Sequence, residues 1–135
     1  CDFLVNRARN FIYSTAPSPL MAATVREALR ILDDEPERRD KLAGLVSLAN
    51  REMERTIGMQ SSGSQILPIL VGDNRRAVRI AEGLRNEGFD VRPIRPPTVA
   101  EGTARLRISI TLNVEPETIS RLFERLAVVM RKEQQ

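Results

Sequence analysis

The chain has 135 residues, about one domain's worth, and its 41% hydrophobic and 29% charged residues are typical of a soluble globular domain with one modest core. It contains no histidine and one cysteine, which excludes an internal disulfide, zinc sites of Cys and His, Ser-His-Asp triads and Cys-His pairs. The net charge of +3 comes from interleaved bases and acids and indicates an anionic partner only weakly. One tyrosine and four phenylalanines are too few for a base-stacking surface, which argues against a nucleic-acid partner.

The sequence also bears on location and completeness. No apolar run approaches the ~20 residues of a membrane helix, and the first residues lack the pattern of a secretory signal, so we expect a cytoplasmic protein without a membrane partner. The chain begins at Cys1 rather than at methionine, and no helix-capping signal precedes residues 1–11. We therefore expect it to be the C-terminal piece of a longer protein.

Three helices are predicted before residue 60. Residues 1–9 have the composition of a helix tail, and Ser18 with Pro19 predicts the N-cap and first turn of a helix that runs to about Asp33. The strongest helical periodicity lies in residues 37–57, where Gly58 is placed to end the helix. One face of that helix is apolar: Leu42, Leu45, Val46, Ala49, Met53 and Ile57.

The pattern then changes to strands that alternate with helices. Residues 66–71 form a short apolar strand, and Pro68 predicts either an edge position or an irregular start because proline cannot donate to a ladder. Asp73 or Asn74 caps a helix that Gly88 closes, and residues 89–94 follow as a second strand.

Residues 103–112 are the clearest strand, and a last amphipathic helix opens at Glu115-Pro116. Side chains alternate along this strand between an apolar face (Ala104, Leu106, Ile108, Ile110, Leu112) and a polar face (Thr103, Arg105, Arg107, Ser109, Thr111). We predict an α+β fold in which a small, mostly antiparallel sheet of about three strands is covered on one face by helices. Residues 1–36 are interpreted as a linker and long helix joining a large domain outside this chain, and 37–135 as a small α+β domain.

The polar face of the strand is the first candidate site. Arg105 and Arg107 point the same way, and a guanidinium matches a carboxylate or phosphate with two parallel hydrogen bonds. An ordinary solvated face would show the same pattern, and periodicity alone favours it. The loop before the strand presents Arg95 and Thr98 around two prolines, which stiffen it, so either an anion site or a rigid connector fits.

Two other polar groups have simpler explanations. The arginines at 75, 76 and 79 are interpreted as the exposed face of a helix. Ser14 and Thr15 precede a helix and could cap it or bind a phosphate there, capping being the commoner use.

Three segments of the chain form a recognisable series: YSTAPSP at 13–19, QILPILVGDN at 65–74 and IRPPTVAEGTARLRIS at 94–109. Together with the last helix they resemble, in the same order, the C-terminal part of the 8-amino-7-oxononanoate synthases. These belong to the α-oxoamine synthases, pyridoxal-phosphate enzymes of the aspartate-aminotransferase fold. The resemblance covers essentially the whole chain, and its specific part is the third segment.

The resemblance implies a decarboxylative condensation of L-alanine with pimeloyl-CoA, or with the acyl-carrier-protein thioester, in biotin biosynthesis. It implies a homodimer with pyridoxal 5'-phosphate as cofactor and no metal. It further implies that Arg107 grips the amino acid's carboxylate and that Arg95 and Thr98 line the acyl-substrate site. By the same resemblance Thr15, with Ser14, reaches the other subunit's cofactor phosphate.

In that family the lysine that holds the cofactor lies upstream, so the resemblance implies that this piece holds no catalytic residue and is inactive alone. Two alternatives stay open. A glycine C-acetyltransferase or another α-oxoamine synthase would differ in the acyl substrate. A non-catalytic module would use the arginines to bind an acidic ligand.

Overall fold

The computed structural model describes residues 2–8, 16, 18–60 and 63–133. The chain divides into two compact units, Cys1–Pro36 and Glu37–Gln135. The first unit holds α1 (Asp2–Arg7) and α3 (Pro19–Asp34). Ser18 is the N-cap of α3 as predicted. Its carbonyl oxygen accepts the first helical bond, from Ala22 N at 3.1 Å, but its hydroxyl makes no capping bond.

No residue of α3 is buried, although the helix carries a stripe of apolar residues. Met21 and Leu29 are both 61% exposed, and Val25 between them is 55% exposed. A soluble helix normally buries such a stripe. In this chain α3 therefore presents an apolar face without a cover.

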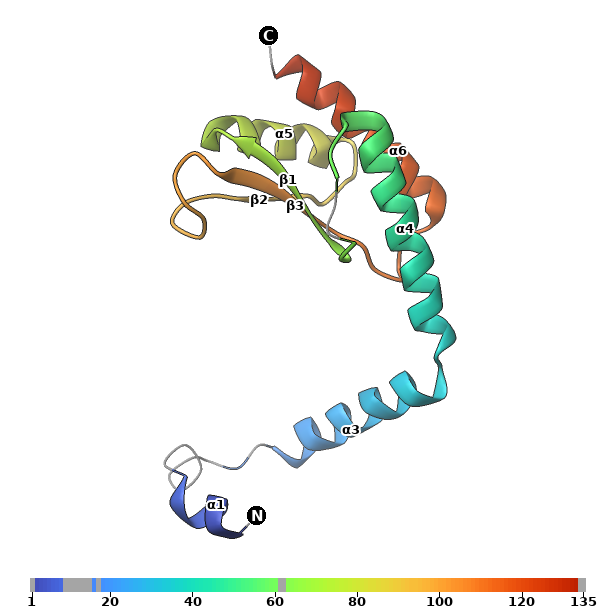
Figure 1. Ribbon diagram of the computed structural model, residues 1–135, viewed down its shortest axis with the longest axis vertical. Helices are drawn as coiled ribbons and strands as arrows, with labels where there is room; N and C mark the ends of the chain where they lie inside the picture. The colour runs from blue at the N-terminus through green and yellow to red at the C-terminus, as the bar shows by residue number, and fades with distance from the viewer. Residues whose placement is uncertain (1, 9–15, 17, 61–62, 134–135) are drawn as a thin grey trace. The chain divides into compact units, whose positions relative to one another are not determined.

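The second unit is built on a three-stranded antiparallel sheet, which confirms the predicted fold (Figure 1). Its strands are β1 (Ile66–Gly72), β2 (Arg92–Ile94) and β3 (Ala104–Ser109), in the order β1-β3-β2. β3 is central, and Leu106 at its middle lies opposite Ile69 on β1 and Pro93 on β2. Pro68 lies in β1, an edge strand, as its missing N–H group predicted.

Two strands are shorter than predicted, and β2 begins late because the residues before it make other hydrogen bonds. Phe89 N donates to Leu84 O at the end of the preceding helix, and Val91 N donates to Phe89 O, so pairing with β3 begins only at Arg92. β3 ends at Ser109 rather than at residue 112, and beyond it Ile110 N still donates to Gln65 O at 2.9 Å. Ile110 is buried although it lies beyond the strand, so the alternation of buried and exposed side chains extends past Ser109.

Helices cover one face of this sheet. α5 (Asn74–Asn86) packs against all three strands and against α6 (Pro116–Lys132), which in turn packs against α4 (Glu37–Ile57), as Figure 1 shows. Asp73 caps α5 by accepting from Arg76 N at 2.7 Å, and Gly58, at φ 66°, follows α4 as predicted. The largest fully buried side chains come from every element of this unit except β2, and from Val91 just before β2: Met53, Leu67, Ile69, Ile80, Leu84, Val91, Leu106, Ile119, Phe123 and Leu126.

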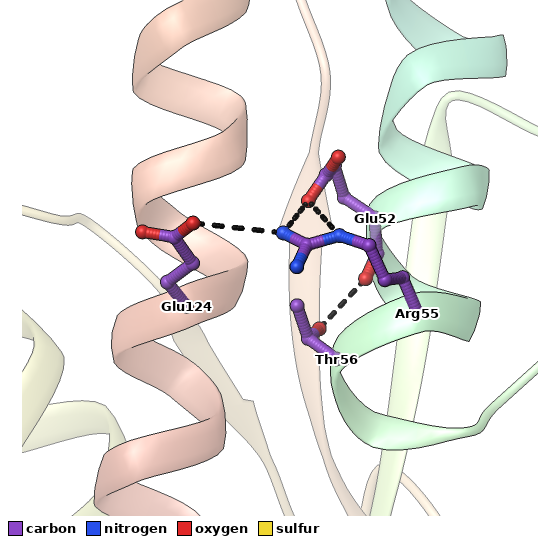
Figure 2. A network of polar contacts seen from close by, with 4 residues as sticks. All are labelled: Glu52, Arg55, Thr56 and Glu124. Carbon is purple, nitrogen blue, oxygen red and sulfur yellow. Dashed lines mark hydrogen bonds and ion pairs between the residues drawn. The ribbon is translucent and has the colours of Figure 1, made fainter.

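A polar network at the surface joins α4 to α6 (Figure 2). Arg55 lies between Glu52 on its own helix and Glu124 on α6, with 3.6 Å between Arg55 Nη2 and Glu124 Oε1. Thr56 Oγ1 donates to Glu52 O at 2.7 Å. Exposed ion pairs contribute little to stability, so the apolar contacts hold these helices together.

A second ion pair, between the end of α5 and α6, should make stability depend on pH. Arg125 Nη2 donates to Glu87 Oε1 at 2.7 Å, and this hydrogen bonding lowers the pKa of Glu87 below its ordinary value of 4.5. A carboxyl whose pKa is lowered by folding stabilises the protein above that ordinary value. The contribution is lost as the pH falls through the lowered, folded-state pKa.

We therefore expect the stability difference between the wild type and Glu87→Gln to be largest above pH 5 and to shrink as the pH falls below 4.5. Urea unfolding followed by circular dichroism at pH 7, 4.5 and 3 measures this. Glu101→Gln, at an exposed loop position, controls for the removal of one carboxylate. A difference that stays constant with pH would show that the Glu87–Arg125 pair does not stabilise the fold.

Candidate functional site

The face of the sheet turned away from α5 is the candidate site and is called the open face. Alternation along β3 buries Ala104, Leu106 and Ile108 against the helices and leaves the intervening side chains on the other side. The register brings to the same face apolar residues of β1, of which Ile66 is 45% and Leu70 is 55% exposed. The open face consists of Ile66, Pro68, Leu70, Arg92, Ile94, Arg105, Arg107 and Ser109.

Arg107 lies at the middle of the open face. Its neighbours across the ladder are Pro68 on β1 and Arg92 on β2. Two like charges directly opposite each other repel, and Asp90 relieves this by pairing with Arg92 at 3.0 Å. The Arg107 side chain is exposed, and it makes no hydrogen bond or ion pair with any residue that the structure describes.

Arg105 differs from Arg107 although both belong to the open face. It is half-buried, and its Nε donates to Thr103 O at 3.1 Å. One donor of its guanidinium is thus already used by the backbone of its own strand. Of the three arginines on the open face, Arg107 is the one whose whole fork is available to a carboxylate or phosphate.

The loop that carries Arg95 and Thr98 is closed by hydrogen bonds at both ends. Thr98 N donates to Arg95 O at 3.0 Å across the cis Pro96–Pro97 peptide, and Thr103 Oγ1 donates to Ala100 O at 2.7 Å. The Arg95 and Thr98 side chains are both exposed. A closed turn holds them outward on a fixed backbone.

The structure does not bring Arg95 to Arg107. Arg95 lines a hollow of about 290 Å³ together with Asn74, Arg75, Val78 and Arg79 of α5. Strand alternation explains this placement, because Pro93 belongs to the helix-covered side and Arg95 has the same parity. Arg95 thus lies on the α5 side of the sheet, whereas Arg107 lies on the open face.

The interpretation of Arg75, Arg76 and Arg79 as one exposed helix face is wrong for Arg76. This residue is half-buried, and its Nη2 donates to Met130 O of α6 at 3.4 Å. Arg79 pairs with Glu133 at 2.5 Å, which raises the pKa of Arg79 above its ordinary value. Sequence reasoning missed the hollow that Arg75 and Arg79 share with Arg95, although their spacing of four residues signals one helix face.

The remaining predicted contacts lie elsewhere. Ser14 and Thr15 fall outside the residues that the structure describes. The two lysines, Lys41 on α4 and Lys132 on α6, are both exposed, and neither belongs to the open face. Among the described helices none has the length and hydrophobicity needed to cross a membrane.

Two curated proteins similar to this chain carry the same name. An 8-amino-7-oxononanoate synthase of Chromobacterium violaceum is 42% identical over 123 residues, which are 91% of this chain and 32% of that protein. A protein of Acetivibrio thermocellus with the same name in provisional form is 47% identical over 110 residues, 81% of this chain and 28% of that protein. The chain therefore spans about a third of the length of the relatives it matches.

Solved structures show the same fold. A serine palmitoyltransferase of Sphingomonas wittichii matches 98% of this chain and 34% of its own, with a TM-score of 0.84 and 20% identity. An 8-amino-7-oxononanoate synthase of Francisella tularensis matches 99% of this chain and 39% of its own, with a TM-score of 0.81 and 24% identity. At the level of sequence, residues 1–126 match the profile of aminotransferase class I and II, and the chain belongs to that family.

Proposed function

We propose that this chain is the C-terminal part of an 8-amino-7-oxononanoate synthase that condenses L-alanine with pimeloyl-CoA, or the acyl-carrier-protein thioester, releasing CO2 and the thiol carrier. The name shared by relatives up to 47% identical supports this reaction. The observation in the structure that carries it is the exposed guanidinium of Arg107 on the open face, with which no described residue pairs.

Arg107 would bind the carboxylate of alanine. Its backbone is fixed by ladders on both sides, and the neighbouring Leu106 and Ile108 are anchored in the core, so the side chain leaves the sheet from a rigid position. A guanidinium holds a carboxylate by two parallel bonds, which fix the orientation of the amino acid as well as its position. Orientation decides which bond at the alanine Cα can react, so a positioning error here would cost rate.

Pyridoxal phosphate would supply the electron sink for this chemistry, and it is named in the description of a related serine palmitoyltransferase structure. The described part of this chain does not fit the role of holding it. Such a cofactor needs a lysine amine inside a site, whereas Lys41 and Lys132 are exposed on helix surfaces. We assign its binding mainly to the part of the protein outside this chain, with Ser14 and Thr15 reaching the partner subunit's cofactor in a cytoplasmic homodimer.

The test compares substrates in the complete protein that contains this chain. With L-alanine and pimeloyl-CoA we expect thiol release at least about tenfold faster than with glycine and acetyl-CoA. The reason is that the two substrate pairs differ both in the amino acid side chain and in the acyl chain that the enzyme must bind. The chain of residues 1–135 alone should release none. Preference for glycine and acetyl-CoA would instead identify a glycine C-acetyltransferase.

A further inference from the structure

A second cluster of arginines lies apart from the open face, at the beginning of α5. Two of its members, Arg75 and Arg79, are one helical turn apart, and Arg95 approaches them from the loop after β2. Val78 and Asn74 complete the lining of a hollow of about 290 Å³. Three cations from two separate segments thus meet around one shallow space.

The cluster is under-neutralised. Arg75 and Arg95 make no hydrogen bond or ion pair with any residue in the described ranges. Within the cluster Glu133 pairs with Arg79, and the Asp73 side chain accepts from Arg76 N as the helix cap, so neither carboxylate pairs with Arg75 or Arg95. Gathering positive charges that lack counter-ions raises the energy of the folded chain, and a bound anion would lower it.

The chemistry of the lining favours a phosphate group. A phosphate monoester carries about −1.5 to −2 charges at pH 7 and three acceptor oxygens, enough for two or three guanidinium groups at once. A carboxylate offers two oxygens and one charge, and would leave part of the cluster unused. Val78 provides an apolar wall beside the cations, against which a carbon substituent of a phosphate ester can lie.

We propose that the hollow lined by Asn74, Arg75, Val78, Arg79 and Arg95 binds a phosphate group. The guanidinium groups of Arg75 and Arg95 would hold it, with the guanidinium of Arg79 beside them. The hollow lies wholly within the unit Glu37–Gln135, which has its own core, and contains no residue of the open face. The resemblance also places Arg95 in the acyl-substrate site, so the test measures phosphate binding to this chain alone, separately from the synthase reaction.

Titration of the 15N-labelled chain with sodium phosphate at constant ionic strength and pH 7.5 tests this. Saturable shifts are expected at the amides of residues 74–79 and 95, and acetate should bind about tenfold more weakly. Arg75→Gln and Arg95→Gln should each weaken phosphate binding by about tenfold. Phenyl phosphate binding more tightly than inorganic phosphate would identify an ester as the ligand, and equal affinity would identify free phosphate.

Arg85→Gln is the matched control. Arg85 is exposed at the other end of the same helix, about 15 Å from Arg75 along its axis, and its loss changes the net charge equally. Phosphate affinity should be unchanged in this variant. Equal weakening by Arg85→Gln, equal affinity for acetate, or shifts that never saturate would overturn the proposal and indicate general charge attraction. The same spectra report whether each variant is folded.

Discussion

Replacing Phe123 with alanine is expected to lower the free energy of unfolding by about 3–5 kcal/mol, a large part of the stability of a domain of this size. Phe123 is fully buried on the face of α6 that belongs to the hydrophobic core, and α6 is the helix that both α4 and α5 contact. Truncation removes the apolar contacts of a whole ring and leaves a cavity in the core. Urea unfolding followed by circular dichroism measures the difference.

Phe3→Ala is the matched control for this prediction. The same atoms are removed, but Phe3 lies on α1 and is 76% exposed in this chain. Its replacement should change the free energy of unfolding by no more than about 0.5 kcal/mol. A similarly small effect of Phe123→Ala would mean that α6 does not pack in the core as described.

The helices of the second unit were predictable because their sequence signals are local. The apolar stripe of residues 37–57 and the stop at Gly58 locate α4 within the chain without reference to any other element. The Asp73 cap likewise depends on residues three positions apart. For such elements tertiary packing selects the face that is buried but does not move the ends.

The strand ends were less predictable because they depend on hydrogen bonds made elsewhere. Phe89 and Val91 have the alternation of a strand and are buried, yet their N–H groups bond within the turn that follows α5. The pattern of hydrophobicity shows which side chains face the core. It does not show which backbone groups pair across a ladder.

The candidate site likewise has features that the sequence predicts and features that it does not. Alternation alone predicts that Arg105 and Arg107 share a face, and the structure confirms this. The hydrogen bond from Arg105 to Thr103 O, which distinguishes the two, depends on side-chain conformation and has no signature in the sequence. The separation of Arg95 from Arg107 follows from the register, in which Pro93 lies opposite Leu106, so that Arg95, two residues later, has the parity of the helix-covered side.

In the complete protein, Arg107→Ala is expected to reduce kcat/KM for L-alanine by about 100-fold, mainly through a higher KM. A bidentate bond between a guanidinium and a carboxylate is charge-assisted at both ends, and its loss corresponds to about 3 kcal/mol. Arg107→Lys retains the charge but not the fork, so it should recover part of this loss. Steady-state kinetics with varied alanine and saturating pimeloyl-CoA measure both effects.

Arg105→Ala removes a guanidinium from the same face and serves as the control for Arg107. Because Arg105 is half-buried and bonded to Thr103 O, its loss should alter alanine kinetics less than either change at position 107. The Arg107 side chain is exposed and makes no hydrogen bond or ion pair with a described residue, so thermal unfolding of the Arg107 variants should match the wild type. If Arg105→Ala were the most damaging of the three for alanine binding, the substrate carboxylate would be held by the half-buried arginine. Its bond to the strand backbone would then have to break when the substrate enters, and Arg107 would be left as a solvated charge.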